Sequence, residues 1–183
     1  MTTVQLWRQL ELHSGEARLC LAVNRWGARR AIANFFGGVN RLGDGIFWYA
    51  LIVAFAVFGG GKGAIAALQM TLTGLVAAGL YRSLKRWTRR PRPFRAHRQI
   101  IAHALPLDEF SFPSGHTLHA VTFSLIALSY FPLLAPLLIP FTLLVATSRV
   151  VLGLHYPSDV LAATAIGCVL AGSSLWLPKL FGF

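Results

Sequence analysis

The sequence predicts an all-α fold: an integral membrane helical bundle of about five transmembrane helices, preceded by an N-terminal interfacial helix. Of the 183 residues, 55% are hydrophobic and only 13% are charged, and the mean hydropathy is +0.59. The apolar residues lie in long blocks without charges, which is typical of membrane spans. The length suits one domain over residues 1–183.

Apolar blocks define the predicted spans, at about 45–58, 62–82, 115–131, 133–151 and 158–177. A transmembrane helix needs about 20 residues, so the first block is barely long enough. No charged residue occurs from Phe110 to Ser148, which is too long for one crossing, and Pro132 and Pro136 divide it. Residues 1–30 mix polar and apolar positions at helical spacing, and residues 31–40 are apolar but too short to cross a membrane, so we expect residues 1–40 to form an interfacial segment.

The charge balance is strongly basic, with 17 Lys and Arg against 6 Asp and Glu and a formal net charge of +11. Membrane proteins carry such cations beside their spans. No segment outside those flanks interleaves basic and aromatic residues, so no nucleic-acid partner is expected. Cys20 and Cys168 have no metal-binding spacing, and we interpret both as small hydrophobic residues.

The first polar group of interest lies in LKRWTRRPRP and contains Lys85 and Arg92. Pro91 and Pro93 predict that the helix stops near Arg90, with Lys85 on its last turn and Arg92 on an extended segment. Two such cations can converge on one anion. Taken alone, a basic membrane flank is the simpler interpretation.

The second group is FPSGHT, in which Pro113 and Gly115 mark a turn into a helix. Backbone N–H groups at a helix N-terminus bind phosphate oxygens, and Ser114 adds a hydroxyl donor. Gly115 lets an anion approach the backbone closely, and His116 is a candidate proton donor. A simple helix cap followed by an incidental histidine is the equally acceptable alternative.

The third group contains Ser148, Arg149, His155 and Asp159. An arginine at the end of an apolar span is costly unless it has a partner or a task. Pro157 is well placed to begin the last helix, so that the Asp159 carboxylate can orient the His155 ring. A solvated histidine and an aspartate that suits the helix dipole form the alternative.

Because the spans alternate in direction, all three groups meet at one membrane face. Three cations with helix N-terminal amides describe a phosphate site, and two histidines with one aspartate describe a nucleophile, its orienting group and a general acid. Phosphate esters hydrolyse very slowly unaided, and converging donors are the usual means of stabilising the transition state.

The pattern K-x6-R-P, P-S-G-H and S-R-x5-H-x3-D, within residues 82–159, resembles the type 2 phosphatidic acid phosphatase superfamily, which includes vanadium haloperoxidases and bacterial acid phosphatases. The resemblance implies that His155 attacks phosphorus, that Asp159 orients it, and that His116 protonates the leaving oxygen and then activates water. It also implies that no metal or other cofactor is needed. The phosphoryl oxygens would be held by Lys85, Arg92, Ser114, Gly115 and Arg149.

The polar residues around this set are not catalytic positions of that superfamily. We expect most of them to form a solvated loop and some to bind a diphosphate or headgroup: Arg89, Arg90, Arg95, His97, Arg98, His103, Asp108 and Glu109. We expect His119, one turn after His116, to be a hydrogen-bonded structural residue.

The predicted function is a cell-membrane, multi-pass lipid phosphatase with a phosphohistidine intermediate and undecaprenyl pyrophosphate as the favoured substrate. Phosphatidylglycerophosphate, phosphatidate and a phosphotransferase reaction stay open. More distant alternatives are a vanadate-dependent haloperoxidase and a non-enzymatic lipid-binding or transport protein.

The sidedness of the site is also open. Most Lys and Arg residues lie on the face of the site, so the positive-inside rule favours the cytoplasm, whereas similar membrane phosphatases usually face outward. Many of those have six spans, and the count here is five.

Overall fold

The computed structural model describes residues 15–180, with side chains described as far as residue 177. Within this range every regular element is a helix or helical turn, apart from one isolated bridge between Pro91 and Phe110. The predicted all-α class is therefore confirmed. The elements are α2 (Gly15–Gly27), α3 (Arg30–Arg41), the π-helical turn η1 (Leu42–Ile46), α4 (Phe47–Phe58), α5 (Gly60–Thr88), α6 (Pro93–Ala96), α7 (Gly115–Tyr130), the 3-10 turn η2 (Pro132–Leu134), α8 (Ala135–Val151) and α9 (Pro157–Leu180).

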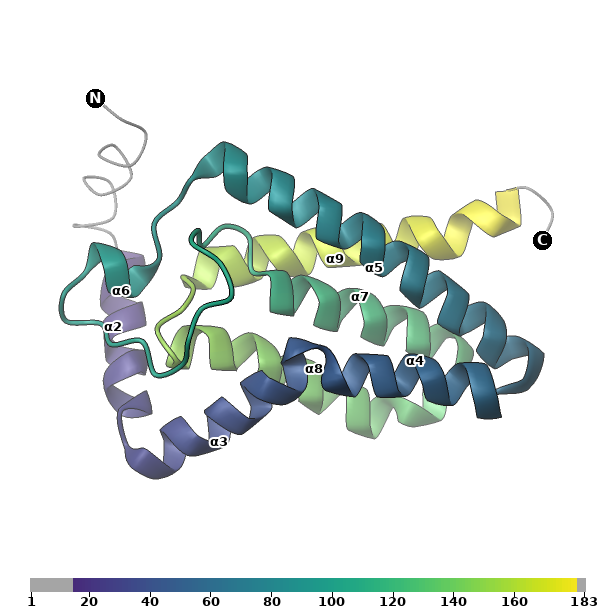
Figure 1. The fold of residues 1–183 in the computed structure, drawn as a ribbon, viewed down its shortest axis with the longest axis horizontal. Coiled ribbons are helices and arrows are strands. Elements are labelled where there is room, and N and C mark those ends of the chain that lie inside the picture. Colours follow the sequence, from purple (N-terminus) through teal and green to yellow (C-terminus); the bar gives the residue numbers. More distant parts are fainter. Residues whose placement is uncertain (1–14, 181–183) are drawn as a thin grey trace.

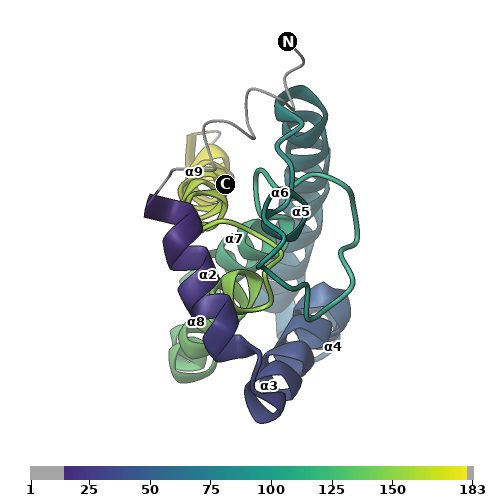
Figure 2. The ribbon, with the colours of Figure 1, turned by 90° about the vertical axis from the view of Figure 1, so that its left-hand side faces the viewer.

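Helices α4, α5, α7, α8 and α9 run along the long axis of the molecule, and α2 lies across one end of them (Figure 1). Seen from that end, α2 crosses in front of the bundle (Figure 2). Helix α7 packs against α5, α8 and α9. It is uncharged throughout and buries residues on every side, as expected of a helix at the centre of a bundle.

Four helical segments of the described chain are long and apolar enough to cross a membrane: Arg30–Phe58, Gly60–Thr88, Pro132–Val151 and Pro157–Leu177. Helix α7 lies among them in the bundle but has only 16 residues. The predicted count of five spans is therefore not confirmed.

The first of these segments begins earlier than the sequence predicted. Residues 31–40 were expected to be interfacial because they are too short to cross alone. Instead α3 continues through η1 into α4, with a kink at Gly45, whose φ is 136° and suits glycine. The rest of the predicted interfacial segment is α2, together with residues 1–14, which lie outside the described range. An interfacial position for α2 stays a prediction.

Aromatic rings and small residues hold the centre of the bundle together. Trp48 of α4 is 1% exposed and contacts Phe123 of α7 and Phe141 of α8, with centroids 5.5 and 5.6 Å away. On α5, Gly74 faces Phe123, whose Cζ would lie 2.8 Å from an added Cβ. Close approach of α5 and α7 therefore depends on glycine at this contact.

The contact between α4 and α5 predicts a stability difference between two glycines of one helix. An added Cβ on Gly63 would overlap the backbone carbonyl of Phe55, whereas on Gly61 it would meet nothing within 4 Å. We expect Gly63→Ala to lower the free energy of unfolding by about 1–3 kcal/mol, the usual cost of overpacking. Thermal unfolding in detergent measures this, with Gly61→Ala as the control. Equal midpoints for the two variants would contradict the described packing.

Candidate active site

The first polar group lies where α5 ends. Helix α5 stops at Thr88, and Arg89 adopts a left-handed conformation with φ 48°. Pro91 and Pro93 keep the chain extended through Arg92, as predicted. This extended piece is fixed to the start of the second group, since the Ser111 N–H donates to the Arg90 carbonyl at 2.9 Å. Lys85 lies on the last turn of α5.

The second group forms the N-terminus of α7. Ser114 is its N-cap, and its Oγ accepts from the Thr117 N–H at 3.5 Å. The Ser114 N–H donates to the Asp159 carbonyl at 3.2 Å, which joins the starts of α7 and α9. Gly115 and His116 begin the helix beside this junction.

The third group lies in the tight turn between α8 and α9. Gly153 has φ 72°, and an added Cβ there would lie 2.7 Å from the Ile101 carbonyl, so the turn requires glycine. The turn folds back so that the His155 N–H donates to the Arg149 carbonyl at 3.0 Å. Helix α9 begins at Pro157, as predicted, which places Asp159 in its first turn.

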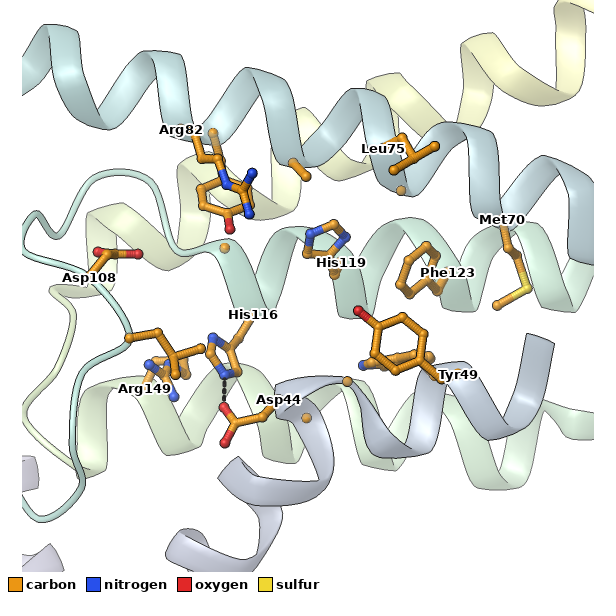
Figure 3. A pocket seen from close by; sticks show the side chains of 18 of the residues that line it. Asp44, Tyr49, Met70, Leu75, Arg82, Asp108, His116, His119, Phe123 and Arg149 are labelled. Atoms are coloured by element: carbon orange, nitrogen blue, oxygen red, sulfur yellow. Dashed lines mark hydrogen bonds and ion pairs between the residues drawn. The ribbon is translucent and has the colours of Figure 1, made fainter. Parts of the chain in front are cut away.

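The three groups open onto one cavity of about 460 Å³. Its polar end is lined by Lys85, Arg92, Gly115, His116, Arg149 and His155. Its other end, between α4, α5 and α7, is lined by apolar side chains (Figure 3). Arg149, His116 and Asp108 lie on one side of Figure 3, and Met70 and Phe123 on the other. The cavity therefore has a cationic end and an apolar end.

The two ring nitrogens of His155 have different neighbours. Nε2 lies 3.2 Å from Nη1 of Arg92, a donor, so Nε2 carries the lone pair. Nδ1 lies 3.5 Å from Oδ2 of Asp159, an ion-pair contact longer than the hydrogen bonds of this carboxylate, and makes no hydrogen bond to the described residues. Burial, followed by the charges of Arg149 and Arg92, lowers the pKa of His155 well below its ordinary value. The neutral form of the ring is therefore favoured.

Asp159 is completely buried and is held on both of its oxygens. Oδ2 accepts from the Tyr156 N–H at 2.9 Å, and Oδ1 accepts from Nη1 of Arg90 at 2.7 Å. Asp159 is not among the residues that line the cavity, whereas His155 is, and an orienting role for Asp159 stays a prediction.

The cations at the polar end differ in their partners. Arg149 is 1% exposed, and its Nε and Nη1 have no hydrogen-bond partner among the residues that the structure describes. Lys85 and Arg92 instead share Asp108, a residue of the loop before α7. Nζ of Lys85 donates to its two oxygens at 2.7 and 2.6 Å, and Nη2 of Arg92 donates to Oδ1 at 2.8 Å. Burial alone would raise the pKa of Asp108, but the bonds from Lys85 and Arg92 lower it.

His116 has a carboxylate partner of its own. Its Nε2 is hydrogen-bonded to Oδ1 of Asp44, in the kinked turn η1 (Figure 3). The two histidines at the polar end are thus each matched with an aspartate, His155 with Asp159 and His116 with Asp44.

The structure brings most of the predicted site residues together, but several residues lie or bond differently from what the sequence predicted. Ser114 does not line the cavity, because its hydroxyl caps α7. His119 does line it, stacked on Phe123 at 5.2 Å, and its Nδ1 lacks the hydrogen bond that was expected. Arg90 and Asp108, expected in a solvated loop, make the ion pairs above.

The sequence analysis also missed Asp44, although a lone carboxylate between apolar blocks was a usable signal.

The fold and the site define a helical membrane protein with a histidine and arginine site at one end of its bundle. Residues 62–181 match the family model described as the PAP2 superfamily, and the chain belongs to that superfamily. This confirms the resemblance drawn from the three motifs. Together with the apolar helices, it makes the chain a multi-pass membrane protein.

Individual relatives differ in the lipid that they are named for. The chain is 33% identical over 125 residues to undecaprenyl-diphosphatase BcrC of Bacillus subtilis, covering 67% of this chain and 63% of that protein. It is 40% identical over 75 residues to phosphatidylglycerophosphatase B of Escherichia coli K12, covering 38% and 30%. The chain thus spans less than two thirds of either relative. The crystal structure of Aquifex aeolicus LpxE is similar with a TM-score of 0.76 and 27% identity, covering 88% of this chain and 95% of that one.

The ion pairs of Asp108 with Lys85 and Arg92 lead to a prediction about the affinity of the site for an oxyanion. We propose that Asp108 competes with an incoming oxyanion for Lys85 and Arg92, because all three lie at the polar end of the cavity. Asp108→Asn removes that charge and is expected to tighten binding of orthovanadate about tenfold, or about 1.4 kcal/mol. Calorimetric titration of the purified protein measures the affinity.

The control is Glu109→Gln, because Glu109 is the neighbouring residue and forms an ion pair with the exposed Arg95. Unchanged vanadate binding in Asp108→Asn would contradict the competition, and weaker binding would mean instead that the carboxylate helps to present the two cations.

Proposed function

We propose that this chain is a membrane lipid phosphatase that transfers the phosphoryl group of its substrate to His155 and then to water. The observation that carries the proposal is the buried guanidinium of Arg149, whose Nε and Nη1 lack partners in the same cavity as His155. Buried donors without partners are costly. A phosphoryl oxygen at this place would satisfy them with charge-assisted hydrogen bonds.

The proposed reaction has two steps at one phosphorus atom. Nε2 of His155 attacks phosphorus while the bond to the lipid oxygen breaks, and His116 gives its proton to that oxygen. His116 then takes a proton from water, which attacks phosphorus and breaks its bond to Nε2, releasing phosphate. Asp159 stabilises the charge on His155 in both steps. The phosphoryl oxygens are held by Lys85, Arg92, Arg149 and the Gly115 amide, with Ser114 supporting the turn.

The apolar end of the cavity favours a lipid as the substrate. Its lining between α4 and α5 includes Ile52, Val53, Met70 and Leu75, which suit a hydrocarbon chain attached to the phosphate. Undecaprenyl pyrophosphate is our first choice, supported by the similarity to BcrC over 67% of this chain. Phosphatidylglycerophosphate is the second, supported by the more local similarity to phosphatidylglycerophosphatase B.

We further propose that the protein resides in the cell membrane and works without a bound metal. The cations of the site supply the charge stabilisation that a metal ion would otherwise supply. EDTA is therefore expected to leave the rate unchanged, and strong inhibition would favour a metal-dependent mechanism.

The nucleophile assignment predicts the effect of one substitution. His155→Ala is expected to lower the rate of phosphate release by at least about 10³-fold, because it removes the nitrogen proposed to form the covalent intermediate. Release is measured with the detergent-purified protein on undecaprenyl pyrophosphate, phosphatidylglycerophosphate and phosphatidate.

The control is His103→Ala, since His103 does not line the cavity, and thermal unfolding checks that both variants are folded. Substantial residual activity in a folded His155→Ala variant would refute the nucleophile. No release from any of the lipids by the unmodified protein would refute the proposed substrates.

A further inference from the structure

Helix α2 binds the loops of the site although it lies outside the part of the chain that matches the family model, residues 62–181. It crosses the end of the bundle at which the loops lie (Figure 2). Asn24 accepts from the Ile101 N–H at 2.9 Å and donates to the Val151 carbonyl at 3.1 Å. The Cys20 thiol faces the His155 carbonyl at 3.8 Å. Helix α2 is thus part of the support of the nucleophile's loop.

Glu16, in the first turn of α2, makes the contacts with the greatest consequence. Its Oε1 accepts from the Ser158 N–H at 2.6 Å, and its Oε2 accepts from Nη2 of Arg90 at 3.0 Å. Ser158 lies in the first turn of α9, where backbone N–H groups have no partner within the helix. Burial alone would raise the pKa of Glu16, but the bonds from Ser158 and Arg90 lower it. Glu16 is therefore held as a carboxylate.

Arg90 connects Glu16 to the orienting carboxylate. Its Nη1 donates to Oδ1 of Asp159 and to Oγ of Ser158, both at 2.7 Å. Its guanidinium carbon lies 4.2 Å from the centroid of the Tyr156 ring, a cation–π distance. The side chain is 6% exposed and does not line the cavity, so Arg90 acts on the site through Asp159.

We propose that Glu16 and Arg90 are positioning residues for the nucleophile. Glu16 fixes the guanidinium of Arg90, Arg90 fixes one oxygen of Asp159, and the other oxygen of Asp159 faces Nδ1 of His155. This chain of contacts holds the His155 ring with Nε2 directed at the phosphoryl site. The inference rests on the proposed function, because it assigns a role in orienting the same nucleophile.

The chain of contacts predicts an effect on kcat with little effect on binding, because Lys85, Arg92 and Arg149 keep their places. Glu16→Gln keeps the shape and one acceptor but removes the charge that faces Arg90. We expect kcat to fall on the order of tenfold, while KM and the vanadate affinity change by less than about twofold. Arg90→Gln is expected to lower kcat further, and Arg90→Lys to restore part of it.

The matched control is Arg89→Gln, because Arg89 is the adjacent arginine but is exposed, with its Nε bonded to the Arg86 carbonyl. Its kinetic constants are expected to stay unchanged. Full-length protein in detergent is used throughout. If Arg90→Gln does not fold, Glu16→Gln carries the test, since it leaves the buried guanidinium in place.

A double-mutant cycle separates positioning from general stability. In an Asp159→Asn background, Glu16→Gln is expected to cause no further loss of kcat, because its effect passes through Asp159. An unchanged kcat in Glu16→Gln alone, or an equal further loss in the Asp159→Asn background, would overturn the proposal.

A second measurement does not depend on turnover. In ¹⁵N-histidine-labelled protein, the nitrogen shifts of His155 are expected to report a proton on Nδ1, and Glu16→Gln is expected to shift them toward a mixture of tautomers. Identical shifts would overturn the inference even if the unmodified protein hydrolysed none of the lipids. If the unmodified protein hydrolyses lipid and Glu16→Gln changes neither kcat nor the His155 shifts, only the positioning inference is refuted. If the unmodified protein hydrolyses none of the lipids and Glu16→Gln still alters the His155 shifts, only the proposed function is refuted.

Discussion

The concentration of buried positive charge at one end of the bundle is the constraint on which the rest of the site depends. Removing a charge from water costs several kcal/mol unless a counter-charge and hydrogen bonds compensate it. Arg90 is compensated by Asp159 and Glu16, and Lys85 and Arg92 share Asp108. Arg149 keeps two nitrogens without partners, beside His155. The positive charge of Arg149 is therefore not compensated by an ion pair with a carboxylate of the described residues, and an oxyanion bound beside it would supply the counter-charge.

The fold brings these charges together through α7, which lies at the centre of the bundle with His116 at its N-terminus. The starts of α7 and α9 are joined by the hydrogen bond from the Ser114 N–H to the Asp159 carbonyl, which links the helix start that carries His116 to the helix that follows His155. The same helix contributes Phe123 to the apolar end of the cavity. One cavity thus spans from buried cations to hydrocarbon-like surface, which matches a molecule with a charged head and an apolar tail.

The site residues that could be predicted are those marked by their neighbours in the sequence. The features that could not be predicted depend on contacts between helices that are distant in the sequence. Lys85, Arg149 and His155 stand out because charged or polar residues at the ends of apolar spans need a reason. Asp44 carried the same signal and was missed, because it served only as the boundary of a span. Residues 31–40 were too short to cross alone, and nothing local showed that the helix continues past Arg41 through a π-helical turn. The pair of Glu16 and Arg90 is separated by 74 residues and exists only because α2 crosses the end of the bundle.

The central claim is that the phosphoryl group is transferred to Nε2 of His155, the nitrogen left with a lone pair by Asp159 and Arg92. Its most direct test is to mix the protein with its lipid substrate for less than one turnover, quench in alkali, where phosphohistidine survives, and locate the phosphoryl group by mass spectrometry. We expect the phosphoryl group on His155, and the amount of phosphorylated protein should rise and then fall as phosphate is released. Phosphate released in the first turnover without any phosphorylated protein, or with the phosphoryl group on another residue, would contradict it.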